Sequence, residues 1–299
     1  GHGDVKKLLF SLSVPTITSQ IVNMLYNLVD RVFIGHMQPA ETVGKLALTG
    51  VGVCLPIIMV ISAFASLMAI GGAPRASIAE GAGESEKSER IMGNCLTVLF
   101  ESFAEPLLLM FGASENTIGY ALDYMRIYAL GTIFVQLTLG MNAYITAQGF
   151  ATVSMKTVLI GALLNTALDP LFIFVLGLGV RGAALATVIS QAVSAVWVMT
   201  FLTGKKTRWY LKRENLHVDA KIVLPCIALG LSPFVMQSTE SLIAICFNSS
   251  LLRYGGDMAV GTMTVLTSIM QFSNMPLQGL TQGAQPIVSY NFGAKNAQR

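Results

Sequence analysis

The sequence predicts an all-α protein that crosses a membrane several times. Hydrophobic residues make up 53% of its 299 residues and charged residues only 12%, whereas ordinary soluble domains have roughly 25% charged residues. Long stretches are almost free of charge, and most exceed the roughly 20 residues that a helix needs to span a bilayer. These stretches cover residues 8–29, 46–74, 127–155, 157–180, 182–204, 222–239 and 258–294. With 19 basic and 16 acidic residues, the chain could not surround that many apolar helices with a soluble polar shell.

The first span carries a narrow line of polar residues. Its members are Thr16, Gln20, Asn23, Asn27 and Asp30, which we call the polar stripe. They are spaced alternately four and three residues apart, so on a helix they share one face. A carboxylate inside a membrane is costly and usually faces a cavity or a partner. The stripe is therefore predicted to face water or solute within a helix bundle.

The third span, residues 93–112, is irregular. Glu101 and Glu105-Pro106 interrupt it after an apolar run that is too short to cross a membrane. Either the helix is broken and its glutamates line a cavity, or residues are missing between Phe100 and Glu101. The second alternative is favoured.

The fifth span, residues 157–180, contains the sequence LLNTALDPLFIF with Asp169 at its centre. Asn165 precedes Asp169 by four residues and shares its helix face. Pro170 predicts a helix kink at the same depth, because proline cannot donate the backbone hydrogen bond. In the sixth span, Thr187 and Gln191 form another pair four residues apart. They either line a cavity or join neighbouring helices.

Amides recur through the last two spans. A single glutamine in a membrane helix usually joins two helices, whereas five amides at helical spacing, as in the eighth span, predict a wetted wall. A substrate cavity is therefore predicted from polar residues of several spans. Its predicted members are Gln20, Asn23, Asn27, Gln191, Gln237, Glu240, Asn248, Gln271 and Gln278.

Comparison of the chain with itself indicates an internal repeat. Residues 13–35 match residues 232–256, with Pro15 on Pro233 and Asp30 opposite Asn248, and residues 70–85 match residues 281–296. Six spans fit between the copies, so the repeats have the same orientation. This predicts a six-helix lobe (1–203), a basic linker (204–221) and an incomplete second lobe (222–299), with about eight of an expected twelve helices present.

Charge distribution predicts the orientation of the chain. Most of the 19 lysines and arginines fall in the N-terminal tail and in alternate connections, so the positive-inside rule predicts a cytoplasmic N-terminus. The net charge of +3 is too small and scattered for nucleic-acid binding. The four cysteines lie in apolar stretches without metal-ligand spacing, which predicts free buried thiols. No signal peptide is evident, because Lys6 and Lys7 lead directly into a long helix.

Three segments carry a family resemblance: YNLVDRVFIG in the first span, NTALDP in the fifth and QGAQPIVSYNFGA after the eighth. With the repeated six-helix unit, the chain resembles the multidrug and toxic compound extrusion (MATE) transporters, and within them the branch of Gram-positive and related bacteria. The resemblance implies two six-helix lobes that open alternately to each side of the membrane. It also implies export of bulky, often cationic compounds in exchange for Na⁺ or H⁺.

Site residues follow from that resemblance. Asp30 matches the aspartate of the family's first helix, Asn165 and Asp169 match its fifth-helix pair, and Thr187 falls at a sixth-helix hydroxyl. Together they imply a site for Na⁺ or a proton. Glu240 matches a seventh-helix acid that some members use in the second lobe.

The resemblance also implies a non-enzymatic transporter of the bacterial inner membrane that needs no cofactor. Its expected partners are small-molecule drugs or toxic organic cations and the lipid bilayer, and it is expected to be a monomer that binds no nucleic acid.

A shared site for Asp30 and Asp169 suggests a mechanism. Two nearby carboxylates in a low dielectric cannot both stay ionised cheaply, so one binds a proton or both coordinate Na⁺. Two other functions remain as alternatives. A flippase for lipid-linked precursors would have a markedly cationic cavity, whereas these polar faces are neutral or acidic. An intramembrane aspartyl protease would require a Gly-x-Gly-Asp element, which neither aspartate helix carries.

Overall fold

The computed structural model describes residues 4–37, 45–101 and 118–296. Within these residues the chain is helical, without strands, as predicted. Its long helices are α1 (Val5–Gly35), α2 (Lys45–Gly81), α3 (Ser85–Glu101), α5 (Ile118–Ala147), α6 (Ala151–Pro170), α7 (Val180–Thr203) and α8 (Ala220–Gly293). Two short elements join them, a π-helical turn at Leu171–Val175 and a 3₁₀ turn at Arg213–Asn215.

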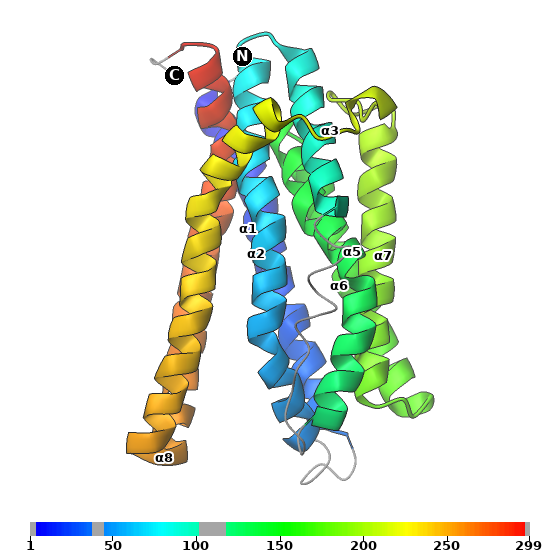
Figure 1. Cartoon of the computed structure of the whole chain (residues 1–299), viewed down its shortest axis with the longest axis vertical. Helices are drawn as coiled ribbons and strands as arrows, with labels where there is room; N and C mark the ends of the chain where they lie inside the picture. The colour runs from blue at the N-terminus through cyan, green and yellow to red at the C-terminus, as the bar shows by residue number, and fades with distance from the viewer. Residues whose placement is uncertain (1–3, 38–44, 102–117, 297–299) are drawn as a thin grey trace.

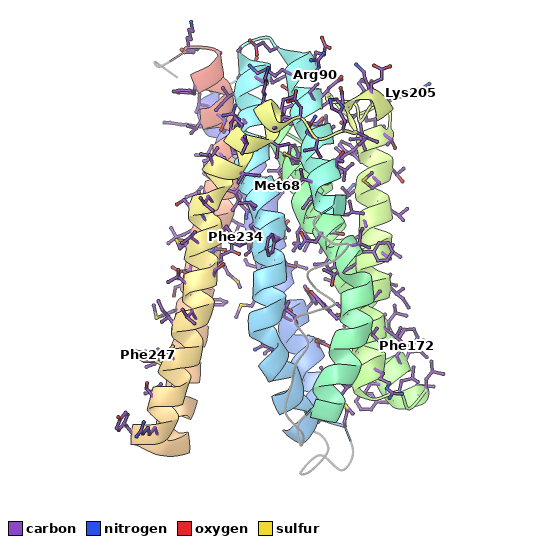
Figure 2. The ribbon with its side chains drawn as sticks, in the orientation of Figure 1. Met68, Arg90, Phe172, Lys205, Phe234 and Phe247 are labelled. Atoms are coloured by element: carbon purple, nitrogen blue, oxygen red, sulfur yellow. The ribbon has the colours of Figure 1, made fainter. Side chains whose placement is uncertain are left out.

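The helices form an elongated bundle with both chain termini at one end (Figure 1). The turn between α2 and α3 and the connection between α7 and α8 lie at this same end, which we call the terminal end. Arg90 of α3 and Lys205 beyond α7 are found there, whereas Phe172 and Phe247 lie at the opposite end (Figure 2). The connections that the sequence grouped by their basic residues thus share one end of the bundle.

Some helix boundaries differ from the charge-free stretches of the sequence. The predicted span 127–155 ends early, because helix α5 stops at Ala147. In the turn that follows, Gly149 adopts a positive φ of 89°, a backbone conformation that ends a helix. Helix α3 ends at Glu101, and residues 102–117, which include Glu105 and Pro106 of the irregular third span, lie outside the described residues. Four described segments are long and apolar enough to cross a membrane. They are Val5–Gly35, Ala151–Val175, Val180–Thr203 and Ala220–Glu240.

Helix α8 contains 74 residues and folds back on itself as two arms (Figure 1). A straight helix of that length would extend about 110 Å at 1.5 Å per residue, several times the thickness of a bilayer. The arms contain the predicted spans 222–239 and 258–294 and meet at the end opposite the termini. The Asp219 carboxylate starts the first arm by accepting a hydrogen bond of 2.9 Å from the Lys221 backbone, which is a standard N-cap.

The main apolar core belongs to the first lobe. Met68 of α2, Leu96 of α3 and Tyr144 of α5 are fully buried in one cluster, to which α7 also contributes. The Tyr144 hydroxyl donates a hydrogen bond of 3.2 Å to the Met68 carbonyl. Because buried polar groups need partners, this bond allows a phenol to join the core. Cys226 of α8 packs on the same cluster, so the first lobe provides the surface on which α8 rests.

Glycines allow the two lobes to approach at backbone distance. A Cβ added to Gly71 of α2 would lie 2.0 Å from the Cys226 carbonyl oxygen, and one on Gly230 of α8 would lie 2.1 Å from the Leu67 carbonyl oxygen. We call this set of interlobe contacts the glycine seam. Its members among the described residues are Gly71, Gly81, Gly230, Gly279, Gly283 and Gly293. All of them lie toward the terminal end, so this end is where the lobes are closed against each other.

The glycine seam has internal two-fold symmetry. The contact of Gly71 on α2 with Cys226 in the first arm of α8 is repeated by the contact of Gly283 in the second arm with Ser13 of α1. In the same way, Gly81 lies against Tyr290, while the equivalent Gly293 lies against Ile78. The repeats are therefore parallel, as predicted, and related by an axis along the bundle.

The symmetric contacts correct the predicted register of the first helix. Ser13 is equivalent to Cys226, so Pro15 does not lie at the position equivalent to Pro233. The sequence alignment followed the two prolines, whereas the backbone contacts of the glycine seam determine which residues of α1 and α8 are equivalent. The second match, residues 70–85 with 281–296, agrees with the contacts to within one residue.

Buried side chains of the first lobe hold the start of the linker. The Gln148 Oε1 atom accepts hydrogen bonds from the Thr207 hydroxyl (2.7 Å) and from the backbone N–H groups of Arg208 (2.7 Å) and Trp209 (3.1 Å). The Trp209 indole is buried and donates to the Glu80 carboxylate at 3.0 Å. The linker is therefore docked on the first lobe.

Two further side chains continue this docking toward α8. The Glu89 carboxylate accepts a hydrogen bond from the Tyr210 backbone (3.1 Å) and forms an ion pair with the Lys212 ammonium (2.7 Å). Asn94 Oδ1 accepts from the Asp219 backbone at 2.6 Å. The hydrogen bond and charge of Glu89 raise the pKa of Lys212. The ammonium therefore stays charged to a higher pH than usual, and the ion pair weakens only as the pH rises through that raised pKa.

Replacing Gln148 with alanine is expected to loosen the linker. The change leaves three donors of residues 207–209 without their acceptor, and each unsatisfied buried donor costs about 1–3 kcal/mol. We expect a lower thermal unfolding temperature and faster tryptic cleavage at Arg208 in the purified protein. Substitution of the exposed Lys206 by alanine is the control and should change neither the unfolding temperature nor cleavage at Arg208. Unchanged cleavage of the Gln148 variant would contradict this role.

Candidate functional site

A cavity of about 530 Å³ lies between the two lobes. Its walls come from α1, α2, α5, α6, α7 and both arms of α8. This volume falls in the range of small-molecule sites. The glycine seam closes the bundle on the side of the cavity toward the terminal end. Below the seam, the rings of Phe64 on α2 and Phe234 on α8 meet edge to face across the lobes at 5.0 Å, and Figure 2 places Phe234 between these helices.

All five members of the polar stripe line this cavity, but they have two different surroundings. Nearest the terminal end, the Thr16 hydroxyl donates to the Gly279 carbonyl at 2.6 Å, and Gln20 Nε2 donates to Gln282 Oε1 at 3.1 Å. These bonds join α1 to α8 beside the glycine seam. Asn23, Asn27 and Asp30 lie farther along α1, where the same face borders the open cavity.

The predicted cavity residues of α7 and α8 are only partly brought together. Gln191, Gln237 and Gln278 line the cavity, as do Gln282 and Gln285, and Gln237 Nε2 donates to the Ser66 hydroxyl of α2 at 3.4 Å. Glu240 is exposed and does not line the cavity, in contrast to the prediction. Although the two residues share a helix face, Glu240 lies about one turn beyond the cavity-lining Gln237 along α8. The side chains of Asn248 and Gln271 lie outside the described residues.

A second polar cluster lies beside the cavity, within the first lobe. Asp169 and Asn165 of α6 are fully buried and do not line the cavity. The Asn165 side-chain amide donates to Asp169 Oδ1 at 3.3 Å and to the Thr187 hydroxyl of α7 at 3.4 Å. Asp30 of α1 is close enough for its charge to act on Asp169. We call these four residues the carboxylate cluster, and Asp30 and Thr187 form its boundary with the cavity.

The carboxylate cluster contains oxygens without hydrogen-bond partners. Among the described residues, no donor reaches the buried atoms Asp30 Oδ1, Asn165 Oδ1 or Asp169 Oδ2. Buried acceptors of this kind are rare, and each one is costly unless a donor or a cation satisfies it. Carboxylate, amide and hydroxyl oxygens are hard ligands that suit a hard cation, and a carboxylate also accepts a proton. The cluster is therefore chemically suited to bind Na⁺ or H⁺.

The helix that carries Asp169 changes its hydrogen bonding at the next residue. Helix α6 ends at Pro170, and Leu171–Val175 form a π-helical turn in which the Leu176 N–H donates to the Leu171 carbonyl at 2.9 Å. Proline cannot donate its share of the α-helical ladder, which explains why the ladder changes here. Short π-helical turns frequently occur at functional sites. The predicted kink therefore takes the form of a π-helical turn directly after the buried carboxylate.

Charges around the cavity nearly balance. Asp30 and the adjacent Arg31 are the charged side chains among the described residues that line it. Helical geometry turns neighbouring residues about 100° apart, so a single stripe would include only one of them. The cavity is wide enough at this depth to include both. Its remaining polar lining is uncharged.

Sequence reasoning missed several polar cavity residues. Ser62 and Ser66 of α2, Thr138 and Asn142 of α5, and Ser154 of α6 line the cavity. Asn142 Nδ2 donates to the Ser154 carbonyl at 3.3 Å, so the two helices are joined at the cavity wall. Small hydroxyl residues also occur in helix contacts, so most of these residues gave no clear signal. Only Thr138 and Asn142, which are four residues apart on one helix, could have indicated a polar face.

Comparison with known proteins gives a consistent family assignment. A family model described as MatE matches residues 15–171 and 233–299. The multidrug export protein MepA of Staphylococcus haemolyticus (strain JCSC1435) is 26% identical over 301 residues, and the match covers 97% of this chain and 65% of that protein. MepA of Staphylococcus aureus (strain NCTC 8325 / PS 47) is 23% identical over 300 residues, with the same coverage.

A solved structure has a closely similar fold. It is described as the outward-facing conformation of a multidrug resistance MATE family transporter of the MOP superfamily, and it superposes with a TM-score of 0.89 at 25% identity. The match covers 99% of this chain and 67% of the solved chain. The present chain spans 65% of the length of the MepA proteins that it matches.

Proposed function

Since this chain belongs to the MatE family, we propose that it acts in the export of small toxic molecules driven by an ion gradient. The observation that carries the proposal is the contact between two sites. A cavity large enough for a drug-sized molecule borders a buried carboxylate cluster through Asp30 and Thr187. The relatives named as multidrug export proteins are transporters rather than enzymes, which supports a transport function.

The carboxylate cluster provides the proposed coupling site. Asp169, Asn165 and Thr187 hold one another, and three oxygens of Asp30, Asn165 and Asp169 have no partner among the described residues. A proton on one carboxylate, or Na⁺ between them, would relieve the repulsion of two nearby negative charges. Because Asp30 also lines the cavity, the charge of the cluster acts directly on a bound molecule.

Competition through Asp30 explains how ion entry would release the exported molecule. An ionised Asp30 attracts a cationic compound in the cavity, whereas a neutralised cluster attracts it less. The π-helical turn after Pro170 offers a place where α6 could respond to the charge of Asp169. An ion can shift the protein between two states only if it binds one state more tightly, and the cluster is where that preference would arise.

The cavity favours substrates of mixed character. Uncharged amides and hydroxyls supply most of its polar groups, with Asp30 as its acid, which suits amphipathic compounds that are neutral or carry a positive charge. A flippase for lipid-linked precursors would need several cations to hold a pyrophosphate, and Arg31 is the basic residue among the described lining residues. The geometry therefore favours drug export over the flippase.

Alternating access explains why the two lobes are closed against each other at one end of the bundle. The glycine seam closes the terminal end, and a cytoplasmic N-terminus would make this the cytoplasmic side of a bacterial cell membrane. This state corresponds to a cavity that is separated from the cytoplasm. Transport would then require the seam to open so that compounds enter from inside the cell.

Dye efflux from proteoliposomes under separate ion gradients tests the proposed function. With ethidium as the probe, we expect export to be driven by a Na⁺ gradient or a pH gradient and to stop when that gradient is collapsed. Each gradient is imposed alone, and liposomes without protein provide the control for leak. Efflux that is independent of both gradients would refute ion-coupled export.

A further inference from the structure

Two cysteine thiols meet across the boundary between the lobes. Cys95 of α3 and Cys226 in the first arm of α8 are both free and fully buried. Both belong to the same buried cluster, and the two side chains lie close enough to act on each other. Cys246 also lies on α8 but is exposed, so it does not belong to this buried pair. The chain thus brings one thiol from each side of the interlobe contact into reach of the other.

The thiol pair lies directly beside the glycine seam. The Cys226 carbonyl is the group that faces Gly71, and a Cβ on Gly72 would lie 2.8 Å from the Cys95 sulfur. Cys226 Sγ also donates to the Ile222 carbonyl at 3.2 Å, which fixes the direction of the thiol. The distance between the two thiols therefore depends on the closure of the seam.

A basic side chain adjoins this pair. The Arg75 guanidinium of α2 is close enough for its charge to act on both thiols. Positively charged surroundings are typical of cysteines that react with oxidants, whereas cysteines in purely apolar surroundings are inert. The pair therefore differs from ordinary buried cysteines.

We propose that Cys95 and Cys226 form an oxidisable lock that holds the two lobes closed at the terminal end. A peroxide oxidises the thiolate of one cysteine to a sulfenic acid and leaves as hydroxide. The thiol of the other cysteine then condenses with the sulfenic acid, which forms the disulfide and releases one water molecule. A small thiol reductant reverses the reaction by exchange.

The order of these two steps follows from burial. In the closed state neither thiol is exposed, so the oxidant reaches them when the lobes separate, and condensation follows when the seam closes again. The disulfide then joins α3 to α8 and prevents the next opening. This part of the inference rests on the alternating access of the proposed function, whereas the proximity of the thiols does not.

Oxidation of the reconstituted protein tests the lock. Proteoliposomes are treated with a limited amount of hydrogen peroxide, free thiols are blocked with N-ethylmaleimide, and disulfide-linked peptides are identified by mass spectrometry. We expect a Cys95–Cys226 linked peptide, loss of ethidium export and recovery of export with dithiothreitol. Cys226→Ser should form no linked peptide and keep its export under peroxide. Serine fits this position, because Ser13 occupies the equivalent place in the seam.

Cys246→Ser is the matched control and should be inhibited and recovered like the parent protein. Absence of the linked peptide would overturn the proposal, as would undiminished export by the linked protein or equal inhibition of Cys226→Ser. Spin labels at the exposed positions Lys6 and Lys295 report the separation of the lobes in the same samples. If the reduced protein exported no dye, the proposed function would fail. The lock would still be established if the distance between the lobes varied before oxidation and was fixed after it. A separation unaffected by oxidation would overturn it.

Discussion

Asp169→Asn is expected to reduce gradient-driven export by about tenfold or more while leaving the protein folded, because a neutral amide offers no charge for Na⁺ or H⁺ to neutralise. Asp169 is fully buried, and its Oδ1 accepts from Asn165. Asparagine has nearly the same shape, so packing around α6 is preserved. The ion would then bind both states of the transporter equally and could not shift one into the other.

Export of ethidium from proteoliposomes under the driving gradient measures this effect, and size-exclusion chromatography checks folding. Asp219→Asn is the matched control, since Asp219 caps α8 outside the carboxylate cluster and asparagine is an equally good N-cap. That control should export at the parent rate. Export at the parent rate by the Asp169 variant would refute the proposed coupling role.

Gly71→Ala combined with Gly283→Ala is expected to open the terminal end. The added methyl groups would lie 2.0 Å from the Cys226 carbonyl oxygen and 2.6 Å from the Ser13 Cα, distances at which the helices must move apart. Overpacking typically costs about 1–3 kcal/mol at each site, and a change of that size shifts an equilibrium between two states by roughly 5–150-fold. The two added methyl groups would contact different residues, Cys226 and Ser13, so the costs should add.

Spin labels at Lys6 and Lys295 measure the opening as a longer distance between the lobes. Gly140→Ala is the control, because its Cβ would meet only the tip of the Leu99 side chain, 2.5 Å away and within the same lobe. A leucine tip can rotate, whereas a backbone carbonyl of a packed helix cannot. If the double variant kept the parent distance, the seam would not determine closure of this end.

The sequence predicted which residues share a helix face but not what that face contacts. The spacing of the polar stripe correctly groups Thr16 with Asp30, since both line the cavity. It could not show that Thr16 binds Gly279 of the other lobe, because that contact depends on how two distant helices pack. For the same reason, the proximity of Asp169 to Asn165 follows from helical spacing, whereas its proximity to Asp30 depends on tertiary structure.

The glycine seam and the linker contacts were missed for different reasons. Gly279 and Gly283 are four residues apart, a small-residue spacing that allows close helix packing, so these two of the six seam glycines left a signal in the sequence. Gln148 and Glu80 left none, because their roles depend on the fold of a segment about 60 residues or more away in sequence, beyond any local pattern. Glu240 was assigned to the cavity as a polar residue of the seventh span, but the position of α8 leaves its side chain exposed.

Docking of the linker has a consequence for how the chain acquires its orientation in a membrane. The first lobe binds this segment largely through its main chain, by accepting hydrogen bonds from the N–H groups of Arg208, Trp209, Tyr210 and Asp219. Main-chain N–H groups are present whichever side chains the linker carries, except at proline. The side chains of the exposed Lys205 and Lys206 are thus not needed for docking. Substitutions there can change the orientation in which the chain inserts during biosynthesis and still leave the tertiary structure intact.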